Sequence, residues 1–387
     1  MKICFFAHYS SLYGANRSLI DLIDGLKDFG VEPIVFCPSH GELFDVLRGR
    51  GVEVYVAPYT WWVSTHPNIL KIFIKFILNL VLLPALMWRI NKLGVDLIYT
   101  NSSVLPIGFF VAKFLNKPHV WHLREFGELH YKLKFEWGKR SAVKLIQKSA
   151  LIISVSKAID EYYFKDVARD NHCFIYNGVA RASKFLNNKE KALSRNNKRN
   201  KFVFLLAGIV YPAKGQDKAI LAMSLVKKKK PDAQLILAGR ISDESYYQHC
   251  LALIQKHDLS QNVYFRGHVA EMDEIFLTSD ASLMCSQNEA MGRVIVESMG
   301  FCLPVIGFSS GAVCELIQNG VTGYLVNEGS VEQLAEAMIR LANDQSLVKK
   351  LGDQAWKFAS DHFSIESYSS KVFQAISENC AVAESKI

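Results

Sequence analysis

Short apolar segments alternate with longer amphipathic segments along almost the whole chain of 387 residues. The short segments are rich in β-branched and aromatic residues and stay apolar throughout, which is typical of strands buried on both faces of a parallel sheet. The longer segments have the spacing of helices that cover such a sheet. The predicted strands are KICFFAH, EPIVFCP, VEVYVAP, DLIYTN, PHVWHLRE, ALIISVS and CFIYNG in the first half, and FVFLLAG, AQLILAG, NVYFRG, ASLMCS, PVIGF and TGYLV in the second.

This alternation is interrupted once, by the polar, asparagine-rich segment SKFLNNKEKALSRNNKRNK. We therefore predict an N-terminal domain over residues 1–182, a basic interdomain linker over 183–201 and a C-terminal domain over 202–360. A helical segment, 361–387, ends the chain and is expected to pack back toward the N-terminal domain. The predicted fold is α/β, with two doubly wound Rossmann-like domains that face a central cleft. Ligands are expected there, at the carboxyl ends of the strands.

Composition narrows the class of protein. Half of the residues are hydrophobic and about a fifth are charged, as in a folded globular protein. The eight cysteines show no paired spacing of the kind that zinc sites use, so we expect a reducing compartment and no metal. The apolar stretch at the N-terminus is short and has no cleavage site of small residues, so a signal peptide is not predicted and the expected location is cytoplasmic.

The charge is distributed unevenly. Residues 1–182 have 22 Lys and Arg against 15 Asp and Glu, residues 183–201 have 7 against 1, and the rest has 16 against 21. A basic front half favours an anionic partner, either nucleic acid or a membrane surface. Because no nucleic-acid-binding module is recognisable, we do not expect nucleic acid, and an anionic membrane surface becomes the favoured partner.

One long apolar segment, HPNILKIFIKFILNLVLLPALMWRINKLG, predicts a helix over residues 67–93. Lys71, Lys75, Asn79 and Pro84 interrupt it, and a membrane-spanning helix tolerates such residues poorly. The first three recur every four residues and share one stripe of the helix. Two interpretations remain open: a helix packed on the sheet of the first domain, or a helix whose basic face rests on anionic lipid.

Chemistry is suggested first by the segment NEAMGRVIVESMG, which places Glu289 and Glu297 eight residues apart around a predicted helix start. A helix N-terminus favours phosphate, and nearby carboxylates accept hydrogen bonds from sugar hydroxyls. Glu289 would suit a hexose and Glu297 a ribose; the alternative is two unrelated surface acids. Upstream, LLAGIVYPAKGQDKAI places Lys214 and Gly215 in a strand-to-helix loop, where the lysine can reach a phosphate and the glycine permits close approach of the backbone.

Together these segments resemble glycosyltransferase family 4, whose members have the GT-B fold. The family pattern is two glutamates separated by seven residues, then G-x-P-V-I, a glycine-led loop with a glutamate, and N/D-G-x-T-G. The corresponding segments here are EAMGRVIVE, GFCLPVIG, GAVCELI and NGVTG. The resemblance extends over nearly the whole chain and is most specific in the second half.

The resemblance implies retaining transfer of a sugar from a nucleotide-sugar bound by the C-terminal domain, without a metal or other cofactor. Glu289 would contact the donor sugar, Glu297 the ribose and Lys214 the pyrophosphate. The family often has an arginine where this chain has Ile209, so Arg293 becomes a candidate second cation. The remaining implied donor contacts are the backbone of Ala290, Met291, Gly292, Arg293 and Val294, and, bordering the base, Gly267, His268 and Val269.

The N-terminal domain resembles the family more loosely. The family's glycine loop reads G-G-A-E, whereas Tyr13-Gly14-Ala15-Asn16 stands here. Gly14 still permits close approach to a phosphate, and Asn16 becomes an acceptor-side candidate. In PHVWHLREFGE, the resemblance makes His122 a catalytic candidate that hydrogen-bonds the sugar or the acceptor, and Arg124 a candidate for an acceptor phosphate. A dehydrogenase is not favoured, because G-x-G-x-x-G is absent.

The sequence therefore predicts a glycosyltransferase that uses a membrane-anchored glycan or glycolipid acceptor, in the synthesis of cell-surface polysaccharide or lipopolysaccharide. It would be peripheral at the inner face of the membrane. The alternative is a non-catalytic GT-B protein that binds a nucleotide-sugar or a glycan. The retained Glu289, Glu297 and Lys214 favour the enzyme, whereas Ile209 and Asn16 favour the binding protein.

Overall fold

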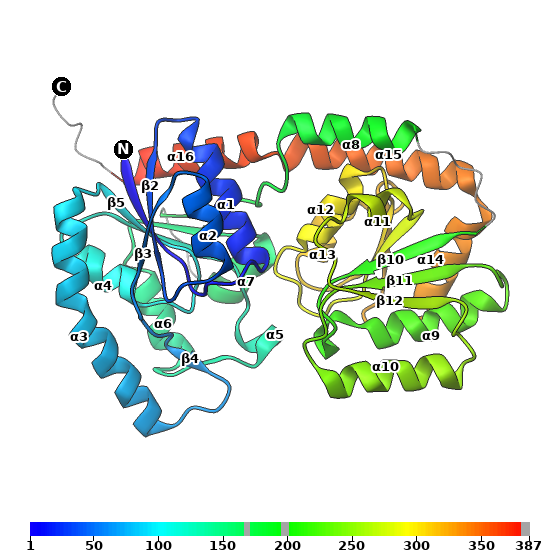
Figure 1. The fold of residues 1–387 in the computed structure, drawn as a ribbon, viewed down its shortest axis with the longest axis horizontal. Helices are drawn as coiled ribbons and strands as arrows, with labels where there is room; N and C mark the ends of the chain where they lie inside the picture. The colour runs from blue at the N-terminus through cyan, green and yellow to red at the C-terminus, as the bar shows by residue number, and fades with distance from the viewer. Residues whose placement is uncertain (166–170, 195–200, 381–387) are drawn as a thin grey trace. The chain divides into compact units, whose positions relative to one another are not determined.

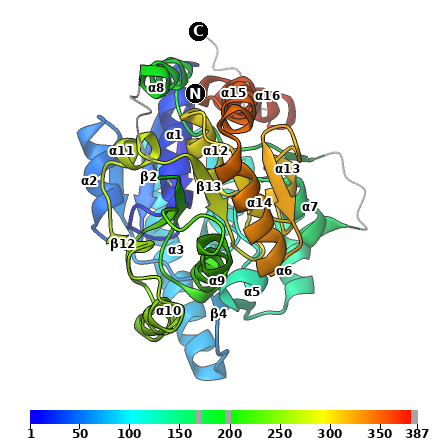
Figure 2. The same ribbon diagram turned by 90° about the vertical axis from the view of Figure 1, so that its right-hand side faces the viewer.

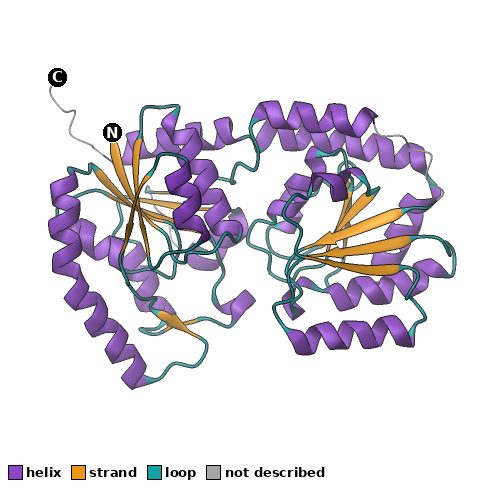
Figure 3. Cartoon of the chain, in the orientation of Figure 1, coloured by secondary structure: helices purple, strands orange, loops and turns teal. Residues whose placement is uncertain are grey.

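The computed structural model describes residues 1–165, 171–194 and 201–380. They form two compact units, one of Met1–Gly178 together with the segment that begins at Ile365, and one of Val179–Ser364 (Figure 1). We call them unit 1 and unit 2. In each unit the strands lie inside and the helices outside (Figure 3), which confirms the predicted pair of doubly wound α/β domains.

Unit 1 has a seven-stranded parallel sheet in the order β3-β2-β1-β5-β6-β8-β9. Its central strands are almost entirely buried because helices cover both faces, which is why their sequences are apolar at every position. The strands are β1 (Lys2–Phe6), β2 (Glu32–Cys37), β3 (Glu53–Val56), β5 (Leu97–Thr100), β6 (His119–Leu123), β8 (Leu151–Ser154) and β9 (His172–Phe174), and a short antiparallel pair joins β4 (Val63–Ser64) to β7 (Lys134–Phe135).

The helices of unit 1 cover its sheet from two sides. Residues of α1 and α16 pack with β1 and β5 in one core cluster, whereas α4 packs closely against β5 and β6. The helices are α1 (Gly14–Lys27), α2 (Glu42–Gly49), α3 (Ile69–Leu93), α4 (Ile107–Phe114), α5 (Glu128–Tyr131), α6 (Lys139–Ile146), α7 (Lys157–Phe164) and α16 (Ile365–Asn379).

Unit 2 has a six-stranded parallel sheet in the order β12-β11-β10-β13-β14-β15. Helices α9, α10 and α14 pack on one face of it, and α11 contributes to the core on the other (Figure 2). The strands are β10 (Val203–Ala207), β11 (Gln234–Ala238), β12 (Val263–Gly267), β13 (Ala281–Met284), β14 (Val305–Phe308) and β15 (Gly323–Val326). The helices are α8 (Ala182–Ser194), η1 (Pro212–Lys214), α9 (Gln216–Lys227), α10 (Glu244–Lys256), α11 (Asp273–Leu277), α12 (Arg293–Gly300), α13 (Val313–Leu316), α14 (Val331–Asn343) and α15 (Gln345–His362).

The predicted linker over 183–201 needs correction. Most of it forms helix α8, which belongs to unit 2 and buries Phe185, Asn188 and Ala192 on one face. The Trp356 indole N–H of α15 donates to the Phe185 carbonyl at 2.8 Å. A polar helix with a narrow buried stripe resembles a linker in composition, which explains the error; residues 195–200 lie outside the described residues.

The C-terminal helix α16 packs against α1 within unit 1. The approach is close at Gly25, where an added Cβ would lie 2.6 Å from the Cβ of Ser369. Tyr368, Val372 and Ile376 of α16 are buried in the same core cluster as β1. Unit 1 is therefore assembled from both ends of the chain.

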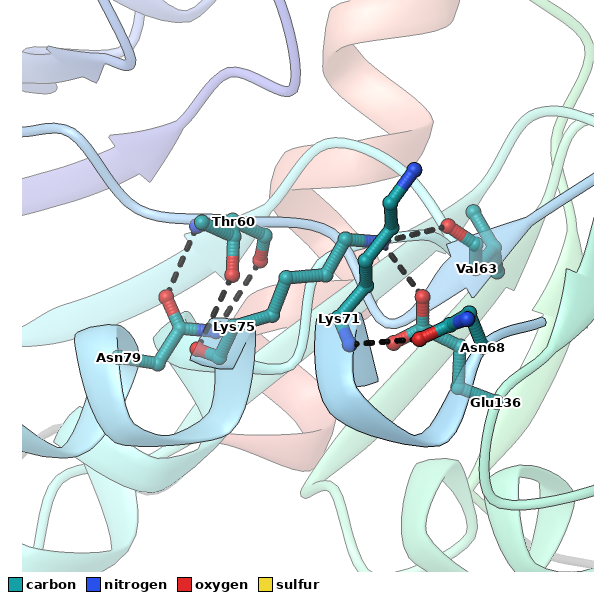
Figure 4. Close-up of polar contacts among 7 residues, drawn as sticks. All are labelled: Thr60, Val63, Asn68, Lys71, Lys75, Asn79 and Glu136. Carbon is teal, nitrogen blue, oxygen red and sulfur yellow. Dashed lines mark hydrogen bonds and ion pairs between the residues drawn. The ribbon is translucent and has the colours of Figure 1, made fainter. Parts of the chain in front are cut away.

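Helix α3 differs from both interpretations of its sequence. It is the one helix among the described residues that is long and apolar enough to cross a membrane, by length and composition. Only Leu83, Leu86 and Ile90 of its 25 residues are buried, so it is not a helix packed on the sheet along its length. The stripe of Lys75 and Asn79 faces the protein, not the outside, so the basic-face interpretation is wrong for these residues as well (Figure 4).

Candidate active site

Two strands that are far apart in the sequence lie side by side in unit 2 and bring Lys214 and Glu289 together. Strands β10 and β13 are neighbours in the sheet, and the chain runs outward from them in opposite directions. Such a reversal of strand order leaves a crevice at the carboxyl ends of the strands, where ligands bind in open α/β sheets. Lys214 ends the short helix that follows β10, and Glu289 lies in the loop that follows β13.

The two side chains form an ion pair across this switch point. Lys214 Nζ lies 2.7 Å from Glu289 Oε2, and the side chains are 17% and 14% exposed. Both groups are therefore partly withdrawn from water while remaining accessible to a small ligand. A cation and a carboxylate at this edge of the sheet offer one group for a phosphate and one for sugar hydroxyls.

Two glycines allow the loops around this pair to approach each other. Gly215 has a φ of +68°, and a Cβ there would lie 2.3 Å from the Cys285 carbonyl oxygen. Gly311 has a φ of +55°, and a Cβ would lie 2.5 Å from the Glu289 carbonyl oxygen, which accepts a hydrogen bond from the Ala312 N–H at 2.8 Å. Only glycine fits these left-handed, crowded positions without strain.

Helix α12 begins at Arg293, four residues after Glu289, and this loop and helix start carry other predicted donor contacts. Gly292 precedes it with a φ of +67° and has no side chain to cap the first N–H groups. Arg293 Nε lies 3.4 Å from Glu297 Oε1, one turn further along, and Arg293 Nη2 donates to the Val179 carbonyl at 3.5 Å. Ala290, Met291 and Gly292 are buried, and Val294 is half-buried.

The remaining predicted contacts of unit 2 lie after other strands of the same sheet. Gly267 ends β12 with a φ of +63°, and His268 after it is exposed, whereas Val269 is half-buried. Ile209 is half-buried, and its carbonyl accepts a hydrogen bond from Gln216 Nε2 at 2.9 Å. No cation therefore replaces the family's arginine at this position.

In unit 1 the glycine loop leads into α1, with Gly14 exposed as its first residue. Asn16 is completely buried, and its Nδ2 donates to the carbonyls of Tyr9 and Ser11 at 2.8 Å each. The amide thus fixes the preceding loop from inside. In this structure Asn16 lies where an acceptor does not reach it, and its place in the sequence gave no sign of this burial.

His122 is also an interior residue. It lies on β6 with no exposed surface, and its Nδ1 is 2.6 Å from the Tyr99 hydroxyl and 3.2 Å from Arg124 Nη2. Burial, reinforced by the Arg124 charge, holds the pKa of His122 well below its usual value. The imidazole is therefore neutral, and the ring has no contact surface for a sugar in this conformation.

Arg124 is the centre of a buried polar network at the carboxyl edge of the unit 1 sheet. Its guanidinium donates to Asn101 Oδ1 and Asn177 Oδ1 at 2.6 Å each and to the Tyr368 hydroxyl at 3.1 Å. Arg124 is only 6% exposed. Its hydrogen bonds therefore indicate a structural role, in which the guanidinium joins several strand ends to α16.

Glu125, which the sequence places at the end of the same strand without a predicted role, is another charge-bearing residue at this edge, and its carboxyl group is buried. Its Oε1 accepts hydrogen bonds from the Ser103 N–H at 2.7 Å and the Ser102 and Ser103 hydroxyls at 2.7 and 2.6 Å. Burial raises the pKa of Glu125 above its usual value, and these donors oppose the shift. The signal that was available is the adjacent pair Arg-Glu after an apolar strand, since a strand end in the interior accommodates charges only when they are paired.

Among residues 1–165, 171–194 and 201–380, no group of three His, Cys, Asp or Glu side chains is placed to hold a metal ion. The cysteines within these ranges are all free thiols.

Comparison with known proteins identifies the family of this chain. Residues 13–182 match the family Glycosyltransferase Family 4, and residues 187–358 match the family Glycosyl transferases group 1. The chain belongs to glycosyltransferase family 4. The two matches meet near the division between the units, so each unit corresponds to one half of the family's architecture.

Relatives of this family 4 chain include two that are 32% identical over part of their length. One is N-acetyl-alpha-D-glucosaminyl L-malate synthase of Bacillus anthracis, over 35% of this chain and 35% of the relative. The other is the GDP-mannose-dependent monoacylated alpha-(1-6)-phosphatidylinositol monomannoside mannosyltransferase of Corynebacterium glutamicum, over 34% and 36%. The chain thus spans about a third of the length of these relatives.

Solved structures share the whole fold. Anabaena Alr3699/HepE in complex with UDP and glucose has a TM-score of 0.79 and 24% identity, and the match covers 97% of this chain and 99% of that one. A glycosyltransferase from Rickettsia africae ESF-5 has a TM-score of 0.80 and 19% identity, over 100% and 99%. These likenesses confirm the GT-B fold of this family 4 member.

Proposed function

We propose that this family 4 chain is a glycosyltransferase that moves a sugar from a nucleotide-sugar donor to a membrane-anchored glycan or glycolipid. The transfer retains the anomeric configuration and requires no metal. Unit 2 binds the donor, with Lys214 at the diphosphate, Glu289 at the sugar and Glu297 at the ribose. The context is the synthesis of a cell-surface polysaccharide or lipopolysaccharide at the inner face of the membrane.

The observation that carries this proposal is the Lys214–Glu289 pair at the switch point of the unit 2 sheet. A nucleotide diphosphate would take Lys214 as a counter-charge and leave Glu289 to accept hydrogen bonds from the sugar. The first turn of α12, which begins four residues after Glu289 and has no side-chain cap, would offer N–H groups to the same ligand. A solved structure of the same fold holds UDP and glucose, a ligand pair of this chemistry.

The missing arginine at Ile209 requires another source of positive charge. Arg293 follows Gly292 at the start of α12 and is now paired with Glu297. Release from this pair would let its guanidinium reach a phosphate, while Glu297 would accept from the ribose hydroxyls. We therefore assign Arg293 to the diphosphate together with Lys214.

A membrane-anchored acceptor is supported by two separate observations. The name of the relative from Corynebacterium glutamicum specifies a phosphatidylinositol mannoside as what that protein acts on. Unit 1 of this chain exposes the apolar helix α3, and residues 1–182 carry more cations than anions. Enzymes that use lipid-linked acceptors work at the membrane surface, where such features are favourable.

The test has two steps. A panel of nucleotide-sugars is first screened for an increase in melting temperature, because a ligand that binds only the folded protein stabilises it. The best donor is then incubated with the protein, and slow release of free sugar in the presence of a chelator is expected. Nuclear magnetic resonance of the first product should show the donor's anomeric configuration, and an inverted product would refute the retaining mechanism.

The alternative, a non-catalytic binding protein, has specific support. Asn16 and His122 are buried and Ile209 supplies no charge, so three positions of the family's site lack their usual contact. A binding protein would show thermal stabilisation by a nucleotide-sugar without any sugar release or transfer. This outcome would favour the binding protein over the enzyme, and the proposed donor site would remain valid.

A further inference from the structure

Helix α3 presents its apolar side to the outside of unit 1. Leu70, Ile74, Ile77, Val81 and Trp88 recur at intervals of three, four and seven residues, and each is between 38% and 71% exposed. These intervals place them on one stripe of the helix. Helices on the surface of a protein in water normally have the opposite orientation, with the apolar stripe inward.

The opposite stripe of α3 is fixed to the protein; it is polar in its first half, at Lys75 and Asn79, and apolar in its second half, at the buried Leu83, Leu86 and Ile90. Lys75 Nζ contacts Glu136, whose side chain is 3% exposed, and the Val63 carbonyl at 3.2 Å. Asn79 Oδ1 accepts from the Thr60 N–H at 2.8 Å, and its Nδ2 donates to the Thr60 carbonyl at 3.1 Å (Figure 4). These bonds hold the helix on the surface of unit 1 and determine which side faces outward.

An apolar slot lies next to this inner stripe. It has a volume of about 190 Å³ and is lined mainly by aromatic and aliphatic side chains from α3, α4 and the segment after β7. Phe76 and Leu80 of α3 line the slot and are themselves exposed, so the slot is continuous with the outer surface of the helix. Trp137 also lines the slot.

The charges on α3 indicate what covers this surface. The helix has no acidic residue. Lys71 and Arg89 flank the apolar stripe, and Lys92 follows Trp88, the last residue of the stripe, by one turn. Cations and tryptophan beside an apolar stripe are the features of helices that lie in the interface of an anionic bilayer. A protein partner would have to bury this stripe without any carboxylate of the helix to pair with.

We propose that α3 lies in the plane of the membrane, with the Leu70–Trp88 stripe in the hydrocarbon region and one hydrocarbon chain of a membrane lipid in the slot. This proposal rests on the membrane-anchored acceptor proposed above and specifies how the enzyme reaches it. The helix does not span the bilayer, because Lys75 and Asn79 tie its first half to Thr60 and Glu136. Binding is therefore mainly hydrophobic, with the flanking cations adding an electrostatic attraction.

The test uses the full chain and vesicles of phosphatidylethanolamine and phosphatidylglycerol at three to one. The variant Leu70→Asn/Ile77→Asn/Val81→Asn should reduce the bound fraction at least tenfold. The control Leu186→Asn/Leu193→Asn changes two equally exposed leucines on α8 and should leave binding unchanged. Binding of the wild type should persist at 1 M salt, where the Debye length is about 3 Å and surface charges are screened.

Fluorescence quenching by lipids brominated on their acyl chains locates the contact. Quenching should decrease in Trp88→Phe for the outer stripe and in Trp137→Phe for the slot. Unchanged quenching in Trp137→Phe would overturn the occupied slot, and complete loss of binding at 1 M salt would overturn hydrophobic insertion. The proposal would also be overturned if the wild type did not bind vesicles but formed a dimer, and the triple Asn variant were monomeric. The apolar stripe would then be the contact with a second copy of the chain.

Two further measurements keep the outcomes separate. Release by alkaline carbonate is expected, and resistance to it would show a spanning helix and overturn the proposal. Thermal stabilisation by the nucleotide-sugar should be the same in the Asn variant and the wild type, because α3 belongs to unit 1 and the donor site to unit 2. Vesicle binding without any donor binding would refute the proposed enzyme while leaving the membrane helix intact.

Discussion

Changing Glu289 to glutamine should strengthen the binding of a free nucleoside diphosphate while it slows sugar transfer. In the structure the Glu289 carboxylate is the counter-ion of Lys214, with 2.7 Å between Oε2 and Nζ. A diphosphate must take Lys214 from this partner. Glutamine has the same shape but no charge, so it leaves the ammonium group free for the ligand.

The magnitude follows from the exposure of the pair. Fully exposed ion pairs contribute about 0.2–1 kcal/mol, and hydrogen bonds to charged groups about 1.5–3 kcal/mol. With side chains 14–17% exposed, the pair falls between these ranges, and we take about 1 kcal/mol. The Kd for the diphosphate should therefore fall about fivefold in Glu289→Gln.

Transfer should move in the opposite direction. If Glu289 binds the donor sugar in the transition state, its loss should cost about 2–4 kcal/mol in kcat/KM. Lys214→Ala should weaken the diphosphate by about 1.5–3 kcal/mol, since a charged hydrogen bond is lost. The two variants should thus change the affinity for the diphosphate in opposite directions. This difference distinguishes Glu289, which competes with the ligand for Lys214, from Lys214, which contacts the phosphate directly.

Isothermal titration calorimetry on four proteins tests this reasoning: wild type, Glu289→Gln, Lys214→Ala and the double variant. In the Lys214→Ala background, Glu289→Gln should have no effect on the Kd, because no ammonium group remains to be released. An equal effect of Glu289→Gln in both backgrounds would refute the proposed competition. Intact thermal unfolding of each variant is the control for folding.

Three other substitutions test the stability of the folded protein. The pKa of buried His119 is lowered to about 3, so between pH 6.5 and 3 this histidine is protonated in the unfolded chain but neutral in the folded protein. Its contribution should therefore lower the free energy of unfolding by about 1.4 kcal/mol for each pH unit of acidification in this range. In denaturation series at several pH values, His119→Gln should have a shallower dependence on pH. Gly215→Ala should destabilise unit 2 by more than Gly329→Ala, because both glycines have a positive φ but only Gly215 would clash, with the Cys285 carbonyl; equal urea midpoints would contradict this. Arg124→Gln should cost about 3–5 kcal/mol in urea unfolding, since it breaks a buried charged network, whereas a loss under 1 kcal/mol would show that the network contributes little.

The fold was predictable because buried parallel strands have an unusual composition. Each of the thirteen predicted strand segments overlaps one strand of the two large sheets, and twelve of them contain the whole strand. The sequence does not contain the information that α8 has a narrow buried stripe at Phe185 and Ala192. Three buried positions in a polar, basic segment do not outweigh its average composition.

The site residues were predictable to different degrees. Lys214 and Glu289 are identified by loops after neighbouring strands, and the structure places them in contact. Asn16 and His122 follow the same rule of position, yet both are interior. The side of a loop or strand end that faces the core depends on three-dimensional contacts that no local pattern records. Here they are the Tyr9 carbonyl for Asn16, and Tyr99 and Arg124 for His122.

The orientation of α3 could not be predicted from the sequence, for a similar reason. An amphipathic pattern shows that a helix has two sides but not which one faces the protein. The inward side is held by partners outside the helix: Glu136, which is 61 residues from Lys75, and Thr60, which bonds to Asn79.

The participation of α16 in unit 1 affects the order in which the protein can be made. Chains leave the ribosome from the N-terminus, and domains generally fold in that order. Here the core around β1 and α1 requires Tyr368, Val372 and Ile376, which are synthesised after every residue of unit 2. The first-made unit is therefore the last to complete its core, after all of unit 2 has emerged. A stop codon at any position from 365 to 380 would remove part of the core of unit 1 and leave all of unit 2 in place.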